Sequence, residues 1–416
     1  DAVRGTFELD DDTSFPFAVM CLGGIRGIKA GAKREAPVFH LVIVNDIFST
    51  MEEAEIMVRP MIRKYPGLRV LLFNLPGQAF TRWAPGQLLT DVYFVECIER
   101  LLCHLDSSKN TIGGTNAFIT HNVPFYMVGF GNGAHISLLH SIKHHRPSLR
   151  GVVSINGYAH VDSHLAGALY DCMNVFKASP AARPDLPIYF FSRFLFSPGY
   201  LQRVTVPLAL NVLTAVQNPI TKDGRIALAR GALSNHDIRA ELTNLEAPLI
   251  VLHSSQNGLV QPMHVEQLMS IEGRRETQTV FGCIHGRKRT CVIWLDGGHA
   301  IAQEKKRSIS TFIERLANGY NEKNDVVFDS NAAEKSPRRG GRGGGGGRRG
   351  IGRPSDAELM KRKTRDPRYR EPTPGQDTLP TPLLTGGTHR TPRHGAKSAL
   401  RGAGASMTTP TRGGRT

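Results

Sequence analysis

The sequence contains no long hydrophobic run. None of its apolar stretches reaches the roughly 18 residues that a membrane-spanning helix needs, so no such helix is expected. The six cysteines are scattered, with no C-x-x-C pair and no Cys/His cluster at zinc-binding spacing. We therefore expect reduced thiols, a cytoplasmic location, and neither a metal nor another cofactor.

Acidic residues are scarce at the C-terminal end of the chain. Residues 331–416 hold 19 Lys and Arg against 6 Asp and Glu, which is +13 of the formal net charge of +16. The first 330 residues therefore hold 33 basic and 30 acidic side chains and are nearly neutral. Because the positive charge is confined to the last part of the chain, the high isoelectric point does not predict a nucleic-acid-binding fold.

Short apolar runs alternate with helical patterns along the first 320 residues. This alternation is typical of βαβ units, in which helices join parallel strands. Runs that predict strands cover residues 17–22, 38–44, 70–73, 125–128, 152–155, 249–252 and 291–295. Patterns that predict helices cover residues 51–64, 88–105, 134–145 and 301–316. We predict an α/β domain over residues 1–320, with a mostly parallel sheet flanked by helices.

The alternation is interrupted at about residues 158–245. This block predicts a helical cap inserted between two strands, with candidate helices at 165–176, 189–196 and 207–216. The periodicity then ends, and residues 321–416 are rich in Arg, Gly, Thr and Pro. Such a composition cannot bury enough apolar surface to offset its ordering entropy, so we predict a disordered tail.

A glycine-rich turn follows the predicted strand at residues 125–128. Residues 129–133 read Gly-Phe-Gly-Asn-Gly and precede a predicted helix. This segment resembles the nucleophile elbow of α/β-hydrolases, G-x-S-x-G, which holds its serine exposed on a sharp turn. Gly131 stands at the position of that serine and offers no oxygen or sulfur for covalent catalysis. The resemblance implies the α/β-hydrolase fold without its nucleophile.

The other two members of the hydrolase triad are only partly present. After the predicted strand 249–252, Asn257 stands where the acid is expected, and an amide cannot stabilise an imidazolium by charge. His299, before the last predicted helix, stands at the position of the general base. Two of the three positions, Gly131 and Asn257, therefore carry residues that do not fit the chemistry. We interpret His299 as a relic or a satisfied loop histidine.

The loop that contributes to the oxyanion hole is also unusual. It carries Asn45 and Asp46, where hydrolases often have a His-Gly pair. A carboxylate at Asp46 would oppose the negative charge that develops in this hole. Asn132 follows Gly131, and we interpret it as a residue that tolerates the positive φ of the turn.

Five short motifs together resemble the N-myc downstream-regulated (Ndr) family. They are Gly-Phe-Gly-Asn-Gly-Ala at 129–134, Asn-Asp-Ile at 45–47, Pro-Gly-Gln at 76–78, Ser-Ile-Asn at 154–156 and Ser-Ser at 254–255. Their order is that of the family, whose members have a hydrolase fold without a hydrolase nucleophile. The resemblance implies a cytoplasmic, non-enzymatic adaptor or signalling-associated protein with a phosphorylatable tail. His299 departs from the family pattern, since the family generally lacks this histidine.

The tail combines basic clusters with Thr-Pro and Ser-Pro dipeptides. Its RGG-like and basic clusters comprise Arg338, Arg339, Arg342, Arg348, Arg349, Lys361, Arg362 and Lys363. Candidate phosphorylation sites are Ser336, Thr373, Thr381, Thr391 and Thr409, each of which would add close to two negative charges. These features fit an anionic partner, which is RNA, a microtubule surface or an anionic membrane, and they also fit a solvated linker.

Three functions remain open at this point. The first is a catalytically inactive α/β-hydrolase fold that binds protein partners, with the tail as a switchable electrostatic tether. The second is a divergent, esterase-like hydrolase that uses His299 with a repositioned nucleophile. The third is RNA binding by the tail, with the folded domain as a passenger.

Overall fold

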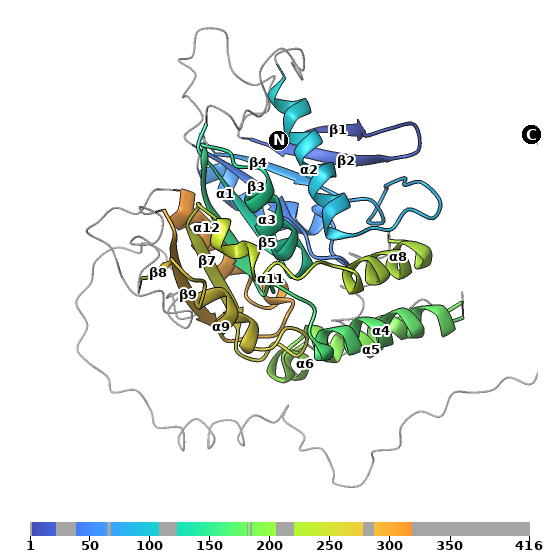
Figure 1. The fold of residues 1–416 in the computed structure, drawn as a ribbon. Coiled ribbons are helices and arrows are strands. Elements are labelled where there is room, and N and C mark those ends of the chain that lie inside the picture. The colour runs from blue at the N-terminus through green and yellow to red at the C-terminus, as the bar shows by residue number, and fades with distance from the viewer. Residues whose placement is uncertain are drawn as a thin grey trace, which may run out of the picture. The chain divides into compact units, whose positions relative to one another are not determined.

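The structure is a computed structural model that describes residues 2–21, 39–64, 68–107, 123–180, 182–183, 185–204, 220–277 and 287–317. In these residues a nine-stranded sheet has the order β1-β2-β4-β3-β5-β6-β7-β9-β8 (Figure 1). The strands are β1 (Ala2–Glu8), β2 (Ser14–Met20), β3 (Phe39–Val44), β4 (Leu68–Phe73), β5 (Phe125–Phe130), β6 (Leu149–Ile155), β7 (Leu249–Ser254), β8 (Arg275–Glu276) and β9 (Arg289–Leu295). The hairpin β1–β2 joins β4 antiparallel, and all other pairs are parallel, which confirms the predicted mostly parallel sheet.

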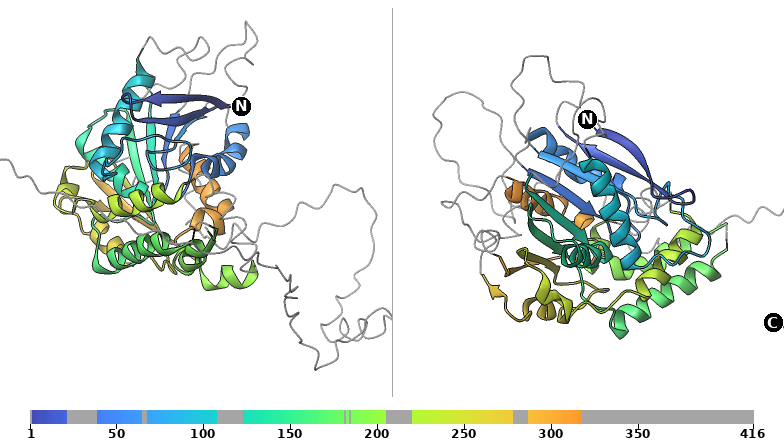
Figure 2. Two further views of the ribbon diagram at one scale, coloured as in Figure 1. Left: turned by 90° about the vertical axis from the view of Figure 1, so that its right-hand side faces the viewer. Right: turned by 45° about the horizontal axis from the view of Figure 1, so that its top comes forward.

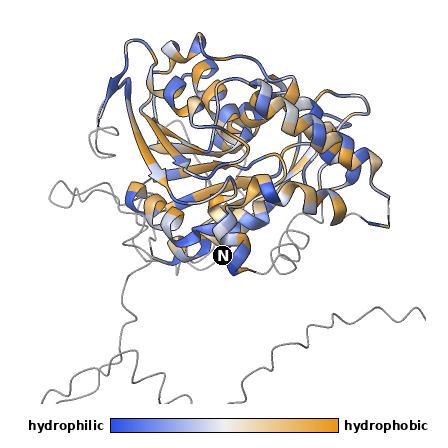
Figure 3. Cartoon of the chain, turned by 90° about the horizontal axis from the view of Figure 1, so that it is seen from below, coloured by the Kyte–Doolittle hydropathy of each residue, from blue (hydrophilic) through white to orange (hydrophobic). Residues whose placement is uncertain are grey.

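Both faces of the central strands are buried. In β3, Leu41 and Ile43 belong to the hydrophobic cluster on one face, and Val42 and Val44 belong to the cluster on the opposite face. Successive side chains of a strand point to opposite faces, so a strand covered on both sides is apolar throughout. Figure 3 shows the strands mostly in the hydrophobic colour, whereas the helices carry hydrophilic positions as well.

Helices cover the two faces of this sheet. On one face lie α1 (Met51–Lys64), α11 (Ile301–Glu304) and α12 (Lys306–Ala317), and α1 contacts α12. On the other face lie α2 (Asp91–Asp106), α3 (Asn132–Lys143) and α9 (Met263–Met269). The loops at the carboxyl ends of β3, β5, β7 and β9 therefore meet at one edge of the sheet, which is where parallel sheets place their sites.

A group of helices occupies the chain between β6 and β7. Its described members are α4 (Ser163–Ala178), α5 (Asp185–Leu195), α6 (Pro198–Arg203), α8 (Lys222–Leu233) and the 3-10 helix η2 (Glu241–Asn244). Three of these helices begin at a side-chain N-cap, formed by Asp162 for α4, Ser197 for α6 and Thr221 for α8. The helix α4 packs against α5 and α8, and together they form a layer at one end of the sheet (Figures 1 and 2).

Several predicted elements differ from the structure. The strand expected at 17–22 is β2, which begins earlier and pairs with β1, a strand that the sequence analysis missed. The helix expected at 301–316 is interrupted at Lys305, whose backbone (φ −124°, ψ 42°) is not helical, so α11 and α12 are separate. The helix expected at 207–216 lies outside the described residues. No helix in the described part of the chain is both long and apolar enough to cross a membrane.

Candidate functional site

The turn between β5 and α3 is a sharp elbow made of one residue. Gly131 has φ 51° and ψ −118°, a backbone conformation that side chains with a Cβ adopt only under strain. At Gly129 and Gly133 a Cβ would collide with backbone atoms of α3 and of the end of β3. Gly129 and Gly133 are therefore required by the packing of the elbow, and glycine at 131 avoids the strain of its bend.

The carboxylate of Asp46 fills the position that a nucleophile would take. A Cβ built on Gly131 would lie 2.5 Å from Cγ and 2.6 Å from Oδ2 of Asp46. Oδ1 of Asp46 accepts hydrogen bonds at 2.9 Å from the backbone N–H groups of Ile47 and Asn132. In α/β-hydrolases the oxyanion hole is made by two backbone N–H groups, one from the residue after the nucleophile and one from the loop that corresponds here to the loop after β3. An oxygen of the chain itself thus occupies that hole.

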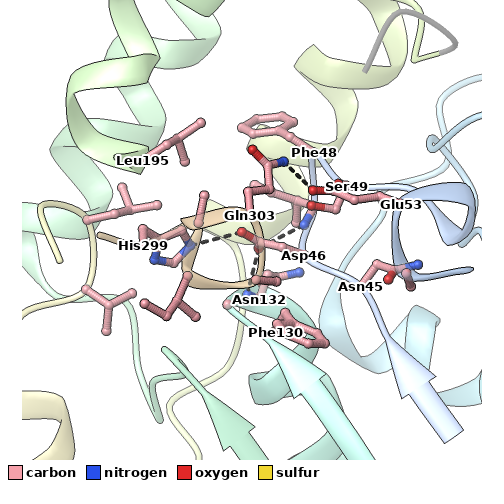
Figure 4. A pocket seen from close by; sticks show the side chains of 18 of the residues that line it. Asn45, Asp46, Phe48, Ser49, Glu53, Phe130, Asn132, Leu195, His299 and Gln303 are labelled. Carbon is pink, nitrogen blue, oxygen red and sulfur yellow. Dashed lines mark hydrogen bonds and ion pairs between the residues drawn. The ribbon is translucent and has the colours of Figure 1, made fainter. Parts of the chain in front are cut away.

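The other oxygen of this carboxylate faces His299. Oδ2 of Asp46 lies 2.9 Å from Nε2 of His299, and the two side chains point toward each other in Figure 4. Burial alone would raise the pKa of Asp46, but the hydrogen bond and the charge of His299, with the two N–H donors, lower it below its usual value. Asp46 is therefore ionised at neutral pH.

Hydrogen bonding determines where the protons of His299 lie. Its Nδ1 is 3.2 Å from Oδ1 of Asn257. The same Oδ1 accepts from the backbone N–H groups of Leu259 and Val260, at 3.0 and 2.9 Å, which fixes it as the oxygen of the amide. Because Asp46 is ionised, Nε2 of His299 donates to it. The nitrogen that faces the elbow therefore carries a proton and is not a general base in this arrangement.

The structure brings together most of the residues singled out in the sequence, but not in the expected roles. Asn257 orients His299, as the acid of a triad would. Asn45 turns away from the oxyanion hole and donates from Nδ2 to the carbonyl of Phe73, so its assignment to that hole is not supported by the position of its side chain. The interpretation of Asn132 is wrong, because the positive φ belongs to Gly131 and Asn132 begins α3.

The side chain of Asn132 belongs to a buried polar network that the sequence analysis missed. Its Oδ1 accepts from the Tyr158 hydroxyl at 2.6 Å and from Nδ2 of Asn235 at 2.7 Å. Tyr158 stacks on His135, whose Nε2 is 2.9 Å from Oδ2 of the fully buried Asp91. No local motif could indicate this network, because its members come from α2, α3 and two separate loops.

Asp91 holds the segment that follows α8 against the core. Its carboxylate accepts from the backbone N–H and from Nδ1 of His236, at 2.8 and 2.9 Å. Burial raises the pKa of Asp91, but the hydrogen bonds from His135 and His236 outweigh it and hold the pKa far below its usual value. Asn132 at the elbow is therefore fixed through Tyr158 and Asn235 to a buried charged anchor.

A pocket of about 250 Å³ opens beside Asp46 and His299 (Figure 4). Its apolar walls include Phe48, Leu165, Leu169, Leu195, Leu259 and Val260. Glu53, from the first turn of α1, lies in the wall and accepts a hydrogen bond from Nε2 of Gln303. Burial, together with the nearby charge of Asp46, raises the pKa of Glu53.

The remaining predicted site residues are not placed by the structure. The basic clusters of the tail and the candidate phosphorylation sites, from Ser336 to Thr409, lie outside the described residues. Within the part of the chain that is described, no group of three or more His, Cys, Asp or Glu side chains could hold a metal ion. Five cysteines are described, and none of them forms a disulfide with another described cysteine.

Comparison with solved structures identifies the architecture. The chain is similar to MGS-M2, an α/β-hydrolase from a Medee basin deep-sea metagenome library, with TM-score 0.56 and 17% identity over 76% of this chain and 98% of that one. It is similar to an enol-lactonase from Burkholderia xenovorans, with TM-score 0.54 and 14% identity over 74% and 97% of the two chains. A thermophilic esterase from Thermogutta terrifontis gives TM-score 0.53 and 14% identity over 76% and 98%.

The fold is that of the α/β-hydrolases. At these identities the likeness shows the fold alone. No family model matches the chain, and no curated protein matches its sequence. The resemblance to the Ndr family therefore remains a prediction from the short motifs.

Proposed function

We propose that this chain is a catalytically inactive α/β-hydrolase-fold protein that acts as an interaction module, in the adaptor or signalling-associated manner that the Ndr resemblance implies. One observation carries the proposal: Asp46 occupies both the nucleophile's position and the oxyanion hole. Hydrolysis by a catalytic serine needs a nucleophile, a free base and an empty hole for the developing oxyanion. Gly131 supplies no nucleophile, Nε2 of His299 donates to Asp46, and the hole contains a negative charge.

The loss of rate expected from these changes is large. Removing a nucleophilic serine costs a factor of about 10⁶ in kcat in a serine protease. A carboxylate in the oxyanion hole adds electrostatic repulsion of the tetrahedral intermediate, because two like charges would share one set of donors. Retention of the fold with this site supports a protein whose pocket and surface bind without turnover.

A second candidate follows from the contact between Asp46 and His299. Asp46 would be the repositioned nucleophile of a divergent, esterase-like hydrolase. Its carboxylate would attack the acyl carbon of an ester, and the alcohol would leave with the proton of His299 Nε2. Water would then attack Cγ of Asp46 in the acyl–Asp46 anhydride, the acyl group would leave as the free carboxylic acid, and one proton would return to His299, which restores both groups. The distance of 2.9 Å between Oδ2 and Nε2 supports this alternative, as does the likeness of the fold to esterases and lactonases.

Turnover of a panel of acyl esters and lactones distinguishes the two candidates. Wild-type protein is compared with Asp46→Asn and His299→Ala, and labelling by serine-reactive phosphonates is followed in parallel. The proposal expects no turnover above that of both variants and no labelling. Hydrolysis that depends on Asp46 and His299, with ¹⁸O from labelled water entering the Asp46 carboxylate, would replace it with the second candidate.

We also propose that the basic tail binds an anionic partner and that phosphorylation weakens this binding. The +13 charge of residues 331–416 supports the first part, and the Thr-Pro sites support the second. Binding of the full chain and of a chain ending at Asn331 is measured against microtubules, RNA and anionic vesicles in rising salt. Equal binding by both chains to all three would contradict a role for the tail.

A further inference from the structure

The pocket beside Asp46 has the size of a small ligand. An engineered apolar cavity of about 150 Å³ binds benzene, and sites for drug-sized molecules begin at about 300 Å³. At about 250 Å³ this pocket lies between them. Its walls combine Phe48 and Leu259 of the core with Leu165, Leu169 and Leu195 from α4 and α5, and all five side chains are buried. The walls therefore fit a ligand that is largely apolar.

The polar groups at the floor of the pocket are satisfied by one another. The carboxylate of Asp46 is held by His299 and by the backbone N–H groups of Ile47 and Asn132. His299 in turn lies between Asp46 and Asn257. This pair therefore needs no hydrogen bond from a ligand.

Glu53 is the polar group of the pocket wall that is incompletely satisfied. One oxygen, Oε1, accepts from Gln303, whereas Oε2 is buried and has no hydrogen-bond partner among the described residues. Burial and the adjacent negative charge of Asp46 raise the pKa of Glu53, against the lowering effect of hydrogen bonds from Gln303 and Ser49. In its protonated form the carboxyl group carries a hydroxyl, a donor that has no acceptor in the described part of the chain. The terminal torsion of glutamate is soft, so this hydroxyl can turn into the pocket.

We propose that this pocket binds an uncharged, largely apolar small molecule with one hydrogen-bond acceptor, such as a ketone or ester carbonyl, which accepts a hydrogen bond from the hydroxyl of protonated Glu53. The inference rests on the proposed function, because a ligand of this class would be retained and not hydrolysed. An ammonium ligand would find no free carboxylate. A carboxylate ligand would meet the ionised Asp46.

The pH dependence of binding follows from the groups that face Glu53. These are Asp46 from the loop after β3, His299 from the loop before α11, and the exposed Lys306 of α12. Asp46 stays ionised because its pKa is lowered, whereas the pKa of Glu53 is raised. The donor is lost when the pH rises through the raised pKa of Glu53. In Glu53→Gln the amide keeps a donor at every pH, while the other three groups remain.

Four probes of nearly equal shape test the proposal with the full chain. They are acetophenone, cumene, 1-phenylethylammonium and benzoate, and their binding is measured by ligand-observed NMR titration. Acetophenone is expected to bind about three- to tenfold more tightly than cumene, the range of one net hydrogen bond, and the two ions more weakly than cumene. The preference for acetophenone over cumene should decrease with rising pH in the wild type, stay constant in Glu53→Gln and disappear in Glu53→Leu. Leu169→Trp, which fills the pocket away from Asp46, should abolish binding of all four.

Each of the other outcomes overturns the proposal. Equal binding of acetophenone and cumene would show that no donor faces the pocket, and tightest binding of either ion would show a charged site. A preference that survives in Glu53→Leu would place the donor elsewhere. Absence of binding by all four would remove the ligand site but leave the proposed inactivity intact, since that depends on the separate ester assay.

Discussion

Replacing Gly131 with alanine adds one methyl group at the point where Asp46 meets the elbow. The added Cβ would lie 2.5 Å from Cγ of Asp46, far inside van der Waals contact. It would also have to adopt φ 51° and ψ −118°. The variant therefore combines two separate costs, a backbone strain and a collision with a charged side chain.

The magnitude of each cost can be assigned. A non-glycine residue in such a backbone conformation costs on the order of 1–3 kcal/mol. Overpacking by one methyl group costs about 1–3 kcal/mol more, because Asp46 is held by three donors and cannot move without losing them. We expect Gly131→Ala to lower the free energy of unfolding by about 2–6 kcal/mol.

A matched glycine separates the two costs. Gly86 also has a positive φ, 81°, but a Cβ built there meets nothing within 4 Å. Gly86→Ala should therefore show the backbone strain alone. A double-mutant cycle of Gly131→Ala with Asp46→Ala isolates the collision, and we expect a coupling of about 1–3 kcal/mol that favours the double variant. Urea unfolding monitored by circular dichroism supplies all five stabilities.

Two results would refute this reasoning. If Gly131→Ala and Gly86→Ala lost equal stability, the collision with Asp46 would not exist. If the cycle showed no coupling, the carboxylate of Asp46 would not occupy the nucleophile's position, and the argument for an inactive site would lose its main support.

Three further predictions concern buried ionisable groups. Burial lowers the pKa of His253 to about 4, so this side chain stays neutral in the folded protein, whereas in the unfolded protein it takes up a proton below about pH 6.5. His253 should therefore lower the free energy of unfolding by about 2–3 kcal/mol between pH 7 and pH 4.5. Urea unfolding at both pH values should show that a His253→Phe variant lacks this decrease. Because the pKa of Glu53 is raised, its stabilising contribution is present below about pH 4.5 and is lost as the pH rises through its pKa in the folded protein. The stability of Glu53→Gln minus that of the wild type should therefore be larger at pH 7 than at pH 4. An equal difference at both pH values would contradict this. The pKa of Asp91 is lowered, so its stabilising contribution is present above about pH 3.8 and is lost in acid, the opposite of Glu53. Asp91→Asn should therefore lower the free energy of unfolding by about 3–5 kcal/mol at pH 7 and by less in acid, which thermal unfolding at a series of pH values would show.

The fold could be predicted because its signal is local. The apolar runs of β3 through β7 are buried on both faces, and Gly129 and Gly133 of the elbow are required by backbone contacts. The strand β1 was not predictable in the same way, since its residues Ala2–Glu8 mix apolar and polar side chains without a continuous apolar run and pair with β2 alone. The break at Lys305 likewise leaves no mark in the helical spacing of residues 301–316.

The site could be predicted only in part. Gly131, Asn257 and His299 follow from their positions after particular strands, and the sequence also marks Asp46 as unusual in its loop. That the Asp46 side chain crosses to the elbow, 86 residues away in the chain, depends on the space left by the missing side chain of Gly131. The error about Asn132 has a similar origin, because a residue preference was applied to a position whose conformation is set by its neighbour.

The carboxylate in the oxyanion hole also bears on the history of such a site. A serine introduced at 131 alone would meet Asp46, and loss of Asp46 alone would leave a proton of His299 without its acceptor. Neither single substitution is an easy intermediate, so a serine at the elbow needs both changes together. The interlocking of two side chains thus couples positions 46 and 131, and we expect them to change as a pair.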